Sequence, residues 1–257
     1  MKNITRGVLL ALASLGLLQC SYHTPLAENP EVQLEKTMIE DGVLIYNTEN
    51  YEMSIVGFKG GFEIIYEPSQ AMSLKEAAEK YNLPYIINGS YFEGSRTHAG
   101  WLSILGVQHT PLKADRQLSH MAILDTSLGY LDFPGLDLWD SSMTNSSAIE
   151  FQTGPLVIHA NQVDTLSIRT AINGESSHLR TFLAYTEEDG MNYFIITRQI
   201  GPLEKMAKNL LSLPVFEGKT LYVMNLDGGS STALYSQKHP ELNFNINRPL
   251  PILLGIR

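Results

Sequence analysis

The stretch "TFLAYTEEDGMNYFIIT", Thr181 to Thr197, is the clearest indication of the fold class because it predicts two strands that turn back on each other. Both of its ends are rich in apolar, aromatic and β-branched residues, as buried strands are. Its centre, "TEEDGM", contains Asp189-Gly190, a dipeptide typical of hairpin connections. We therefore expect an antiparallel pair of strands here.

Similar runs lie on both sides of this hairpin. They cluster or alternate β-branched and aromatic residues between turn signals, which is typical of an antiparallel sheet. We expect strands within "GVLIYN", "YEMSIVGF", "FEIIYEP", "WLSILGV", "HMAILD", "LGYLDF", "PLVIHANQV" and "KTLYVMN".

Two segments have helical spacing of their apolar residues. In "MSLKEAAEKYN" this spacing follows Ser73, which with Glu76 predicts a capping box. In "GPLEKMAKNLLSL" it follows Pro202, which we expect at the first helical position. Each helix has one apolar stripe and should lie against a sheet. The predicted fold is α+β, a largely antiparallel sheet with two helices packed on it in a single compact domain.

The two helices lead into similar sequences. The first runs into "LPYIINGSYF" and the second into "GKTLYVMNLDGGSS", so that Asn88 corresponds to Asn225. Each unit reads as a helix, an apolar strand, an asparagine and a polar turn with glycine. An internal duplication and a chance similarity both account for this pattern. A duplication would make the two polar turns converge on one site.

The first residues are typical of an export signal. Lys2 and Arg6 precede an apolar core of the length found in secretory signal peptides. "LLQC" then resembles a bacterial lipoprotein signal, in which the cysteine, here Cys20, becomes lipidated. Gln19 departs from the small residue usual before that cysteine, and an ordinary signal peptide cleaved nearby is the alternative.

These features divide the chain into a signal peptide over residues 1–19, a tether over 20–36 and one domain over 37–257. Cys20 is the only cysteine, so the chain forms no internal disulfide. The predicted location is the bacterial cell envelope, with the membrane reached through the N-terminal lipid.

The charge argues against nucleic acid as a partner. The whole chain has a formal charge of −9, and loss of residues 1–19 leaves 16 basic against 27 acidic side chains, or −11. An acidic surface without a basic run repels phosphate backbones.

Candidate site residues gather in "NLDGGSST", Asn225 to Thr232, directly after the run "KTLYVM". Asp227 at the end of a buried strand can project into a cleft, and two glycines allow a ligand close to the backbone. A tight turn closing a hairpin is the structural alternative. The chain has no GxGxxG, P-loop, HExxH, GxSxG or paired CxxC motif. Its histidines are scattered, and His120 and His178, close to predicted strands, are the most arguable as functional.

Five segments, "INGSYF", "FQTGPLVI", "HLRTFLAYTEEDGMNYFIIT", "GPLEKMAKNLL" and "NLDGGSSTALY", occur in an order that resembles the phosphodiester glycosidase family. The resemblance runs from about Tyr51 to the C-terminal "RPLPILLGIR". It makes residues 37–257 a catalytic domain, with Ser90 in place of the second glycine usual in the family. The residues it marks as site residues are Asn88, Gly89, Tyr91, Phe92, Gly154, Pro155, Arg180, Asn225, Asp227, Gly228, Gly229, Ser230 and Ser231.

The resemblance implies Asp227 and Arg180 as catalytic residues, although the family's arginine also aligns to Arg169. The reaction that the resemblance implies is hydrolysis of the bond between the anomeric carbon of a sugar and a phosphodiester oxygen. It releases a phosphate monoester, a weakly basic leaving group. The site therefore needs hydrogen-bond donors for the phosphate and a carboxylate for the sugar. Arg180 could hold the phosphate through two parallel hydrogen bonds, helped by the amides of Gly228 to Ser231. Asp227 would act as base, as nucleophile or as stabiliser of an oxocarbenium ion. Candidates for a second carboxylate are Glu63, Glu93 and Glu150.

The function expected from the resemblance is an exported hydrolase that cleaves the glycosidic bond of a sugar-1-phosphodiester, with a glycan or sugar phosphodiester as its substrate. The alternative is a glycan-binding envelope lipoprotein without catalysis. A phosphodiesterase that cleaves the P–O bond would need a metal cluster, which the sequence does not display. The hydrolase requires no cofactor, and Asp227 is where a single divalent cation could bind.

Overall fold

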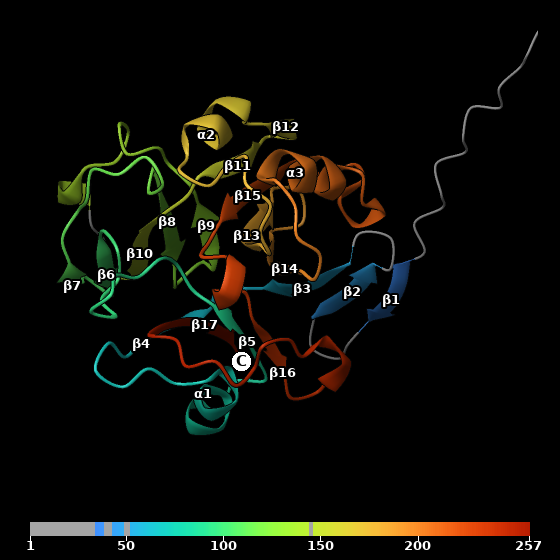
Figure 1. Ribbon diagram of the computed structural model, residues 1–257, viewed down its shortest axis with the longest axis horizontal. Coiled ribbons are helices and arrows are strands. Elements are labelled where there is room, and N and C mark those ends of the chain that lie inside the picture. Colours follow the sequence, from blue (N-terminus) through green and yellow to red (C-terminus); the bar gives the residue numbers. More distant parts are fainter. Residues whose placement is uncertain (1–33, 39–42, 49–51, 144–145) are drawn as a thin grey trace, which may run out of the picture. The chain divides into compact units, whose positions relative to one another are not determined.

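The computed structural model describes residues 34–38, 43–48, 52–143 and 146–257, and these belong to one compact unit (Figure 1). Its largest sheet has eight strands. Their order across the sheet is β1 (Leu34–Met38), β2 (Leu44–Thr48), β3 (Met53–Lys59), β14 (Met191–Thr197), β13 (Thr181–Thr186), β15 (Leu221–Asn225), β11 (Leu156–His159) and β12 (Gln162–Val163).

Two smaller sheets complete the β-structure. The five-stranded sheet has the order β7 (Val107–Thr110), β6 (Leu102–Ile104), β10 (Ala148–Thr153), β8 (His120–Asp125) and β9 (Tyr130–Asp132). The four-stranded sheet has the order β16 (Leu234–Ser236), β5 (Tyr85–Asn88), β17 (Ile252–Ile256) and β4 (Glu63–Tyr66). All ladders between these described strands are antiparallel, which confirms the predicted α+β class.

The hairpin predicted from Asp189-Gly190 joins β13 to β14. The strands close on the pair Thr186 and Met191. The Asp189 carboxylate accepts hydrogen bonds from the Thr186 hydroxyl (2.5 Å) and the Met191 amide (3.2 Å), and Gly190 has a φ of 61°. Aspartate thus fastens both strand ends, and glycine takes the left-handed position that other residues rarely adopt.

The helices begin and end close to the predicted positions. The predicted capping box is present on α1 (Leu74–Tyr81), where Ser73 and Glu76 exchange hydrogen bonds. Pro202 is the N-cap of α3 (Leu203–Leu211) and precedes the first helical residue. A third helix, α2 (Thr165–Thr170), was not predicted because six residues are too few for a periodic pattern. The short 3-10 helices are η2 (Ser141–Met143), η3 (Pro214–Phe216), η4 (Gly229–Ser231) and η5 (Pro240–Leu242).

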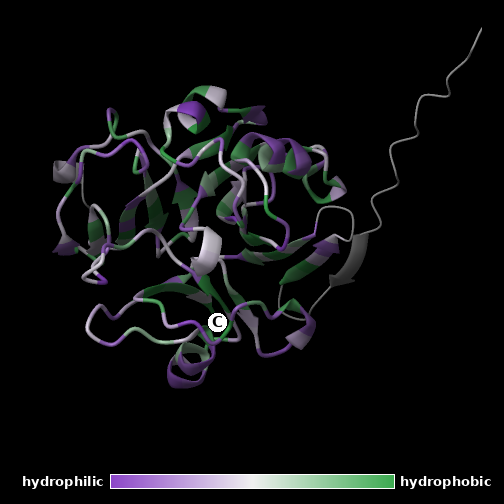
Figure 2. Ribbon diagram, viewed as in Figure 1, coloured by the Kyte–Doolittle hydropathy of each residue, from purple (hydrophilic) through white to green (hydrophobic). Residues whose placement is uncertain are grey.

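The three sheets share one apolar core. Val56 of β3, Ile87 of β5 and Leu124 of β8 all belong to it and are fully buried. A second cluster packs α3 against the other face of the eight-stranded sheet, and a third packs α1 against the outer face of the four-stranded sheet. The eight-stranded and four-stranded sheets therefore lie between α3 and α1, and Figure 2 shows the strands mostly in the hydrophobic colour.

Several observed strands lie outside the runs predicted from the sequence, among them β1, β10, β16 and β17. The strand β10 was not predicted, although its apolar and polar residues alternate from Ile149 to Gln152. All six of its residues are buried, so Glu150 and Gln152 face the interior and not solvent. The strand β1 spans the boundary placed between tether and domain at residue 37. The predicted signal peptide and Cys20 lie outside the described residues. Within the described ranges, no helix is long and apolar enough to cross a membrane.

Candidate active site

The antiparallel register brings polar residues that are distant in sequence together at one end of the strands β13, β15 and β11 in the large sheet. The strand β15 ends at Asn225, which pairs with Phe182 near the start of β13. The strand β11 flanks β15 on its other side and also runs antiparallel to it. Consequently Arg180, just before β13, and Gly154, just before β11, lie beside the polar turn that follows Asn225.

Asn88 joins the two polar turns. Its Nδ2 donates to the carbonyl of Asp227 (2.7 Å) and to that of Gly89 (3.2 Å). Its Oδ1 accepts from the Thr181 hydroxyl (2.7 Å) and the Ala233 amide (3.0 Å). The amide of Asp227 donates back to the carbonyl of Gly89 (3.3 Å). The two polar turns, after Asn88 and after Asn225, do converge. The buried Asn88 side chain links them through hydrogen bonds and is not free to bind substrate.

The hydroxyl of Tyr91 is saturated by protein groups. It donates to the carbonyl of Gly154 (2.9 Å) and accepts from Nε2 of Gln117 (2.6 Å) and Nδ2 of Asn225 (2.5 Å). One donor and two acceptors are all that a hydroxyl offers. Burial, with the nearby Asp227 charge, raises the pKa of Tyr91 well above its ordinary value. The hydroxyl therefore fixes the floor of the site, and only the ring is available to a ligand.

The glycines of the second turn let it press against the segment before Arg180. A Cβ atom on Gly228 would lie 2.7 Å from the carbonyl oxygen of Leu179. The amide of Gly229 donates to that same oxygen (2.8 Å), and Gly229 has a φ of 58°. The amide of Ser231 donates to the carbonyl of Gly228 (3.0 Å). Most amides of this turn are thus engaged within the protein, and the expected anion-binding nest of four free amides is not formed.

A pocket of about 300 Å³ opens at this end of the strands β13 and β15. It combines one carboxylate, one guanidinium, one imidazole, two amide side chains and a tyrosine ring. The residues that line it are Tyr91, Gln117, Asn173, His178, Arg180, Asp227, Gly228, Gly229 and Ser230.

The carboxylate of Asp227 has a perturbed acidity. Burial raises its pKa to about 6, and three groups oppose that rise: the Ser231 hydroxyl, the Gly228 amide (2.9 Å to Oδ1) and the charge of Arg248. A carboxylate with a pKa of about 6 is ionised at neutral pH and yet basic enough to take a proton. Such a group in a polar pocket is a candidate catalytic base.

Arg180 is built into the wall of the pocket. Its side chain is buried, which lowers its pKa, and its Nη2 donates to the carbonyls of Asn173 (2.8 Å) and Ser176 (2.6 Å). Both bidentate modes of a guanidinium use one Nη2 hydrogen, and both hydrogens are already engaged. The expected grip through two parallel hydrogen bonds therefore does not fit this arrangement. Arg180 contributes positive charge and holds the 173–176 loop in place.

The chain matches a known protein family over most of its length. The model of the family described as phosphodiester glycosidase, NAGPA, matches residues 28–257. The chain belongs to the phosphodiester glycosidase family. The family resemblance seen in the sequence motifs is thus confirmed.

Solved structures agree on the fold. The zebrafish N-acetylglucosamine-1-phosphodiester alpha-N-acetylglucosaminidase catalytic domain, auto-inhibited by its pro-peptide, matches with a TM-score of 0.59 and 14% identity, over 88% of this chain and 82% of that one. A hypothetical protein from Synechocystis matches with a TM-score of 0.51 and 12% identity, over 87% of this chain and 61% of that one. No curated protein matches the sequence.

Several family-aligned residues lie outside the pocket lining. The ring of Phe92 packs on the cluster beneath α1, and the Ser90 hydroxyl donates to the carbonyl of Gln152 (3.0 Å). The carbonyl of Pro155 accepts from the amide of Asn225 (3.0 Å). The alternative family arginine, Arg169, is exposed in the last turn of α2 and does not line the pocket, whereas Arg180 does.

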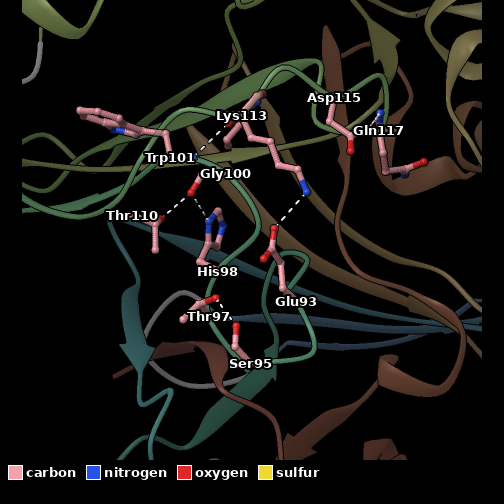
Figure 3. Close-up of polar contacts among 11 residues, drawn as sticks. Glu93, Ser95, Thr97, His98, Gly100, Trp101, Thr110, Lys113, Asp115 and Gln117 are labelled. Atoms are coloured by element: carbon pink, nitrogen blue, oxygen red, sulfur yellow. Dashed lines mark hydrogen bonds and ion pairs between the residues drawn. The ribbon is translucent and has the colours of Figure 1, made fainter.

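None of the three candidate second carboxylates lines the pocket. Glu63 pairs with Arg257, and Glu93 pairs with Lys113 at 3.0 Å (Figure 3). Glu150 is buried beside Trp101, whose Nε1 donates to it (3.3 Å). Among the described residues, Asp227 is the single carboxylate in the pocket lining.

Gln117 and Asn173 line the pocket and were not identified from the sequence. Gln117 comes from a long loop that the buried Gln152 holds in place. The Gln152 side chain accepts from the amides of Trp101 and Lys113 (both 3.0 Å) and donates to the carbonyl of Leu118 (2.8 Å). Figure 3 shows Gln117 at the far end of this loop. Such a loop carries no periodicity, so the contribution of Gln117 could not be predicted from the sequence.

The two histidines raised by the sequence have different positions. His178 lines the pocket and lies two residues before Arg180, so that an extended backbone directs both toward the same side. His120 starts β8, where its Nδ1 meets the Ser119 hydroxyl (2.9 Å) and burial lowers its pKa. His120 does not line the pocket. In the described part of the chain, no group of three or more His, Cys, Asp or Glu side chains is placed to hold a metal ion.

The raised pKa of Asp227 predicts that this residue destabilises the fold at neutral pH. Below its ordinary value of 3.8 the carboxyl is protonated in both the folded and unfolded states and has no effect. Between 3.8 and about 6 the unfolded state loses its proton first, so the free energy of unfolding falls, and above that range the loss is constant. Asp227→Asn mimics the protonated form. By urea denaturation we expect it to be more stable than the wild type by about 3 kcal/mol near neutral pH and equally stable near pH ~3, below the ordinary pKa of the carboxyl. An equal difference at both pH values would contradict the shift.

Proposed function

We propose that the chain hydrolyses the glycosidic bond of a sugar-1-phosphodiester, releasing free sugar and a phosphate monoester. The observation that carries the proposal is the pocket in which Asp227, with a pKa of about 6, faces the same space as Arg180 and His178. Family membership supports the reaction class. So does the fold shared with a zebrafish domain whose name describes a phosphodiester glycosidase.

A single carboxylate suits this chemistry. Ordinary glycosidases need an acid to protonate the leaving oxygen and a second carboxylate on the sugar side. A phosphate monoester leaves without protonation, because it is a weak base. In the proposed step water attacks the anomeric carbon, Asp227 accepts the water proton, and the bond between C1 and the phosphate oxygen breaks. Its electron pair stays on the phosphate, and the positive charge of Arg180 in the pocket wall favours this build-up of negative charge.

The test is a panel of sugar-1-phosphodiesters that differ in the sugar and in the anomer. Free sugar and phosphate monoester are both measured by chromatography, and Asp227→Asn serves as the inactive control. We expect one anomer of at least one sugar to release both products in equal amounts. Binding of all panel members without any turnover would favour the alternative, a glycan-binding protein. Release of sugar 1-phosphate would indicate cleavage of the other phosphate ester bond.

We also propose export to the cell envelope and anchoring through Cys20. The motif "LLQC" after an apolar core motivates this, and these residues lie outside the described ranges. If Cys20 carries the lipid, Cys20→Ser should move the protein from the membrane fraction to the soluble fraction, as followed by immunoblotting. An unchanged distribution would show that another feature of the chain anchors it.

A further inference from the structure

A second hollow adjoins the pocket of Asp227. It has a volume of about 510 Å³ and is lined by Ser230, Asn245, Ile246, Asn247 and Arg248. Ser230 lines both spaces, so the two are neighbours across the polar turn. The proposed function uses only the first space, although a phosphodiester has two halves to accommodate.

Arg248 is the cation of this hollow, and its charge reaches the site. It lowers the pKa of Asp227, which places its guanidinium within electrostatic range of that carboxylate. The side chain of Arg248 is exposed and makes no hydrogen bond or ion pair with any other described residue. All five of its N–H donors are therefore available to a ligand.

The backbone that carries Arg248 is fixed to the polar turn of Asn225 to Thr232. The Asn245 side chain donates to the carbonyl of Thr232 (2.9 Å), and the Arg248 amide donates to the carbonyl of Asn245 (3.2 Å). On its other side the carbonyl of Ile246 accepts from the amide of Lys75 (3.5 Å) at the start of α1. The segment thus holds Arg248 at a defined position relative to Ser230.

Arg180 and Arg248 differ in the N–H donors that each can offer to a phosphate. The Nη2 atom of Arg180 is used by two backbone carbonyls, so that residue cannot form a bidentate pair in this arrangement. Arg248 has its whole planar fork free, and a planar fork matches two phosphate oxygens.

We propose that the hollow beside Ser230 is the subsite for the phosphate-bearing half of the substrate, and that Arg248 is the residue that binds the phosphate. This inference rests on the proposed function for its substrate. In it, the sugar occupies the pocket of Asp227 and Arg180, and the scissile bond lies near Ser230. The phosphate monoester is released from the hollow after the C1–O bond breaks.

The first arm of the test measures binding and does not depend on turnover. Inorganic phosphate is titrated into the full-length protein by isothermal calorimetry near neutral pH. We expect Arg248→Gln to weaken binding by on the order of tenfold or more, since a charge-assisted bidentate pair is lost. Arg169→Gln, a matched change at an exposed arginine on α2, should leave it unchanged. Unaltered binding in Arg248→Gln, a larger loss in Arg180→Lys, or no phosphate binding by the wild type would overturn the assignment.

The second arm measures hydrolysis and separates the inference from the function. Arg248→Gln should lower kcat/KM for the phosphodiester by on the order of tenfold or more. It should also move the acidic limb of the pH profile upward, because the charge that lowers the pKa of Asp227 is gone. Wild-type hydrolysis with equal kcat/KM in Arg248→Gln and Arg169→Gln would refute the subsite and leave the proposed function intact. Phosphate binding through Arg248 in a wild type without hydrolysis would support the subsite and refute the proposed function.

Discussion

Asp227→Asn is expected to lower kcat/KM for a sugar-1-phosphodiester by on the order of a thousandfold or more. Asparagine keeps the shape and can still accept from the Gly228 amide (2.9 Å in the wild type), but it can neither take a proton nor stabilise positive charge on the sugar. General-base contributions of 10² to 10⁴ are typical, and loss of the charge adds to this. Initial rates of sugar release give the comparison.

The matched control is Glu93→Gln, the same change at a carboxylate that pairs with Lys113 outside the pocket. It should retain activity within about twofold, because exposed ion pairs contribute about 1 kcal/mol or less. Thermal unfolding should show both variants folded, with Asp227→Asn at least as stable as the wild type. A folded Asp227→Asn that turns over substrate at the wild-type rate would remove Asp227 from the mechanism.

Asn88→Ala is expected to reduce the free energy of unfolding by about 3 kcal/mol or more. The change leaves three groups without their partners: the buried Thr181 hydroxyl and Ala233 amide, and the half-buried Asp227 carbonyl. An unsatisfied buried polar group costs roughly 1–3 kcal/mol. Urea denaturation measures the loss.

Activity should fall in Asn88→Ala even where the protein is fully folded. The two polar turns lose the hydrogen bonds that link them, and Asp227 is then no longer held in position. Asn247→Ala, the same change at an exposed asparagine, should alter the free energy of unfolding by less than about 0.5 kcal/mol. A loss in Asn88→Ala no larger than that would mean that the turns are held together by other contacts.

The fold class was predictable because its local signals agree with its global packing. The hairpin at Asp189-Gly190 and the capping box of Ser73 and Glu76 each depend on residues close in sequence, and both are present. The strand β10 was missed although Ile149 to Gln152 alternate between apolar and polar residues. Its burial on both faces was not predictable, because the alternation alone places Glu150 and Gln152 on a solvent-facing side.

The residues of the candidate site also include some that were predictable from the sequence and some that were not. Asp227 follows an apolar strand and Arg180 precedes one, so their place at the strand ends could be expected. The neighbourhood of Gln117 could not, because it depends on the Gln152 hydrogen bonds across a long loop. Nor could the commitment of Arg180 Nη2 to the carbonyls of Asn173 and Ser176, since a sequence does not show which donors tertiary contacts consume.

The proposed reaction breaks the bond between the anomeric carbon and the phosphate oxygen. Hydrolysis in 18O-labelled water identifies the broken bond, with the label in the phosphate monoester measured by mass spectrometry. The phosphate is the informative product, because a sugar's anomeric oxygen also exchanges with water by itself. Attack at carbon, as proposed for Asp227 and its water, predicts a phosphate monoester without 18O. One 18O atom in the phosphate would show attack at phosphorus and would rule out the proposed cleavage at carbon.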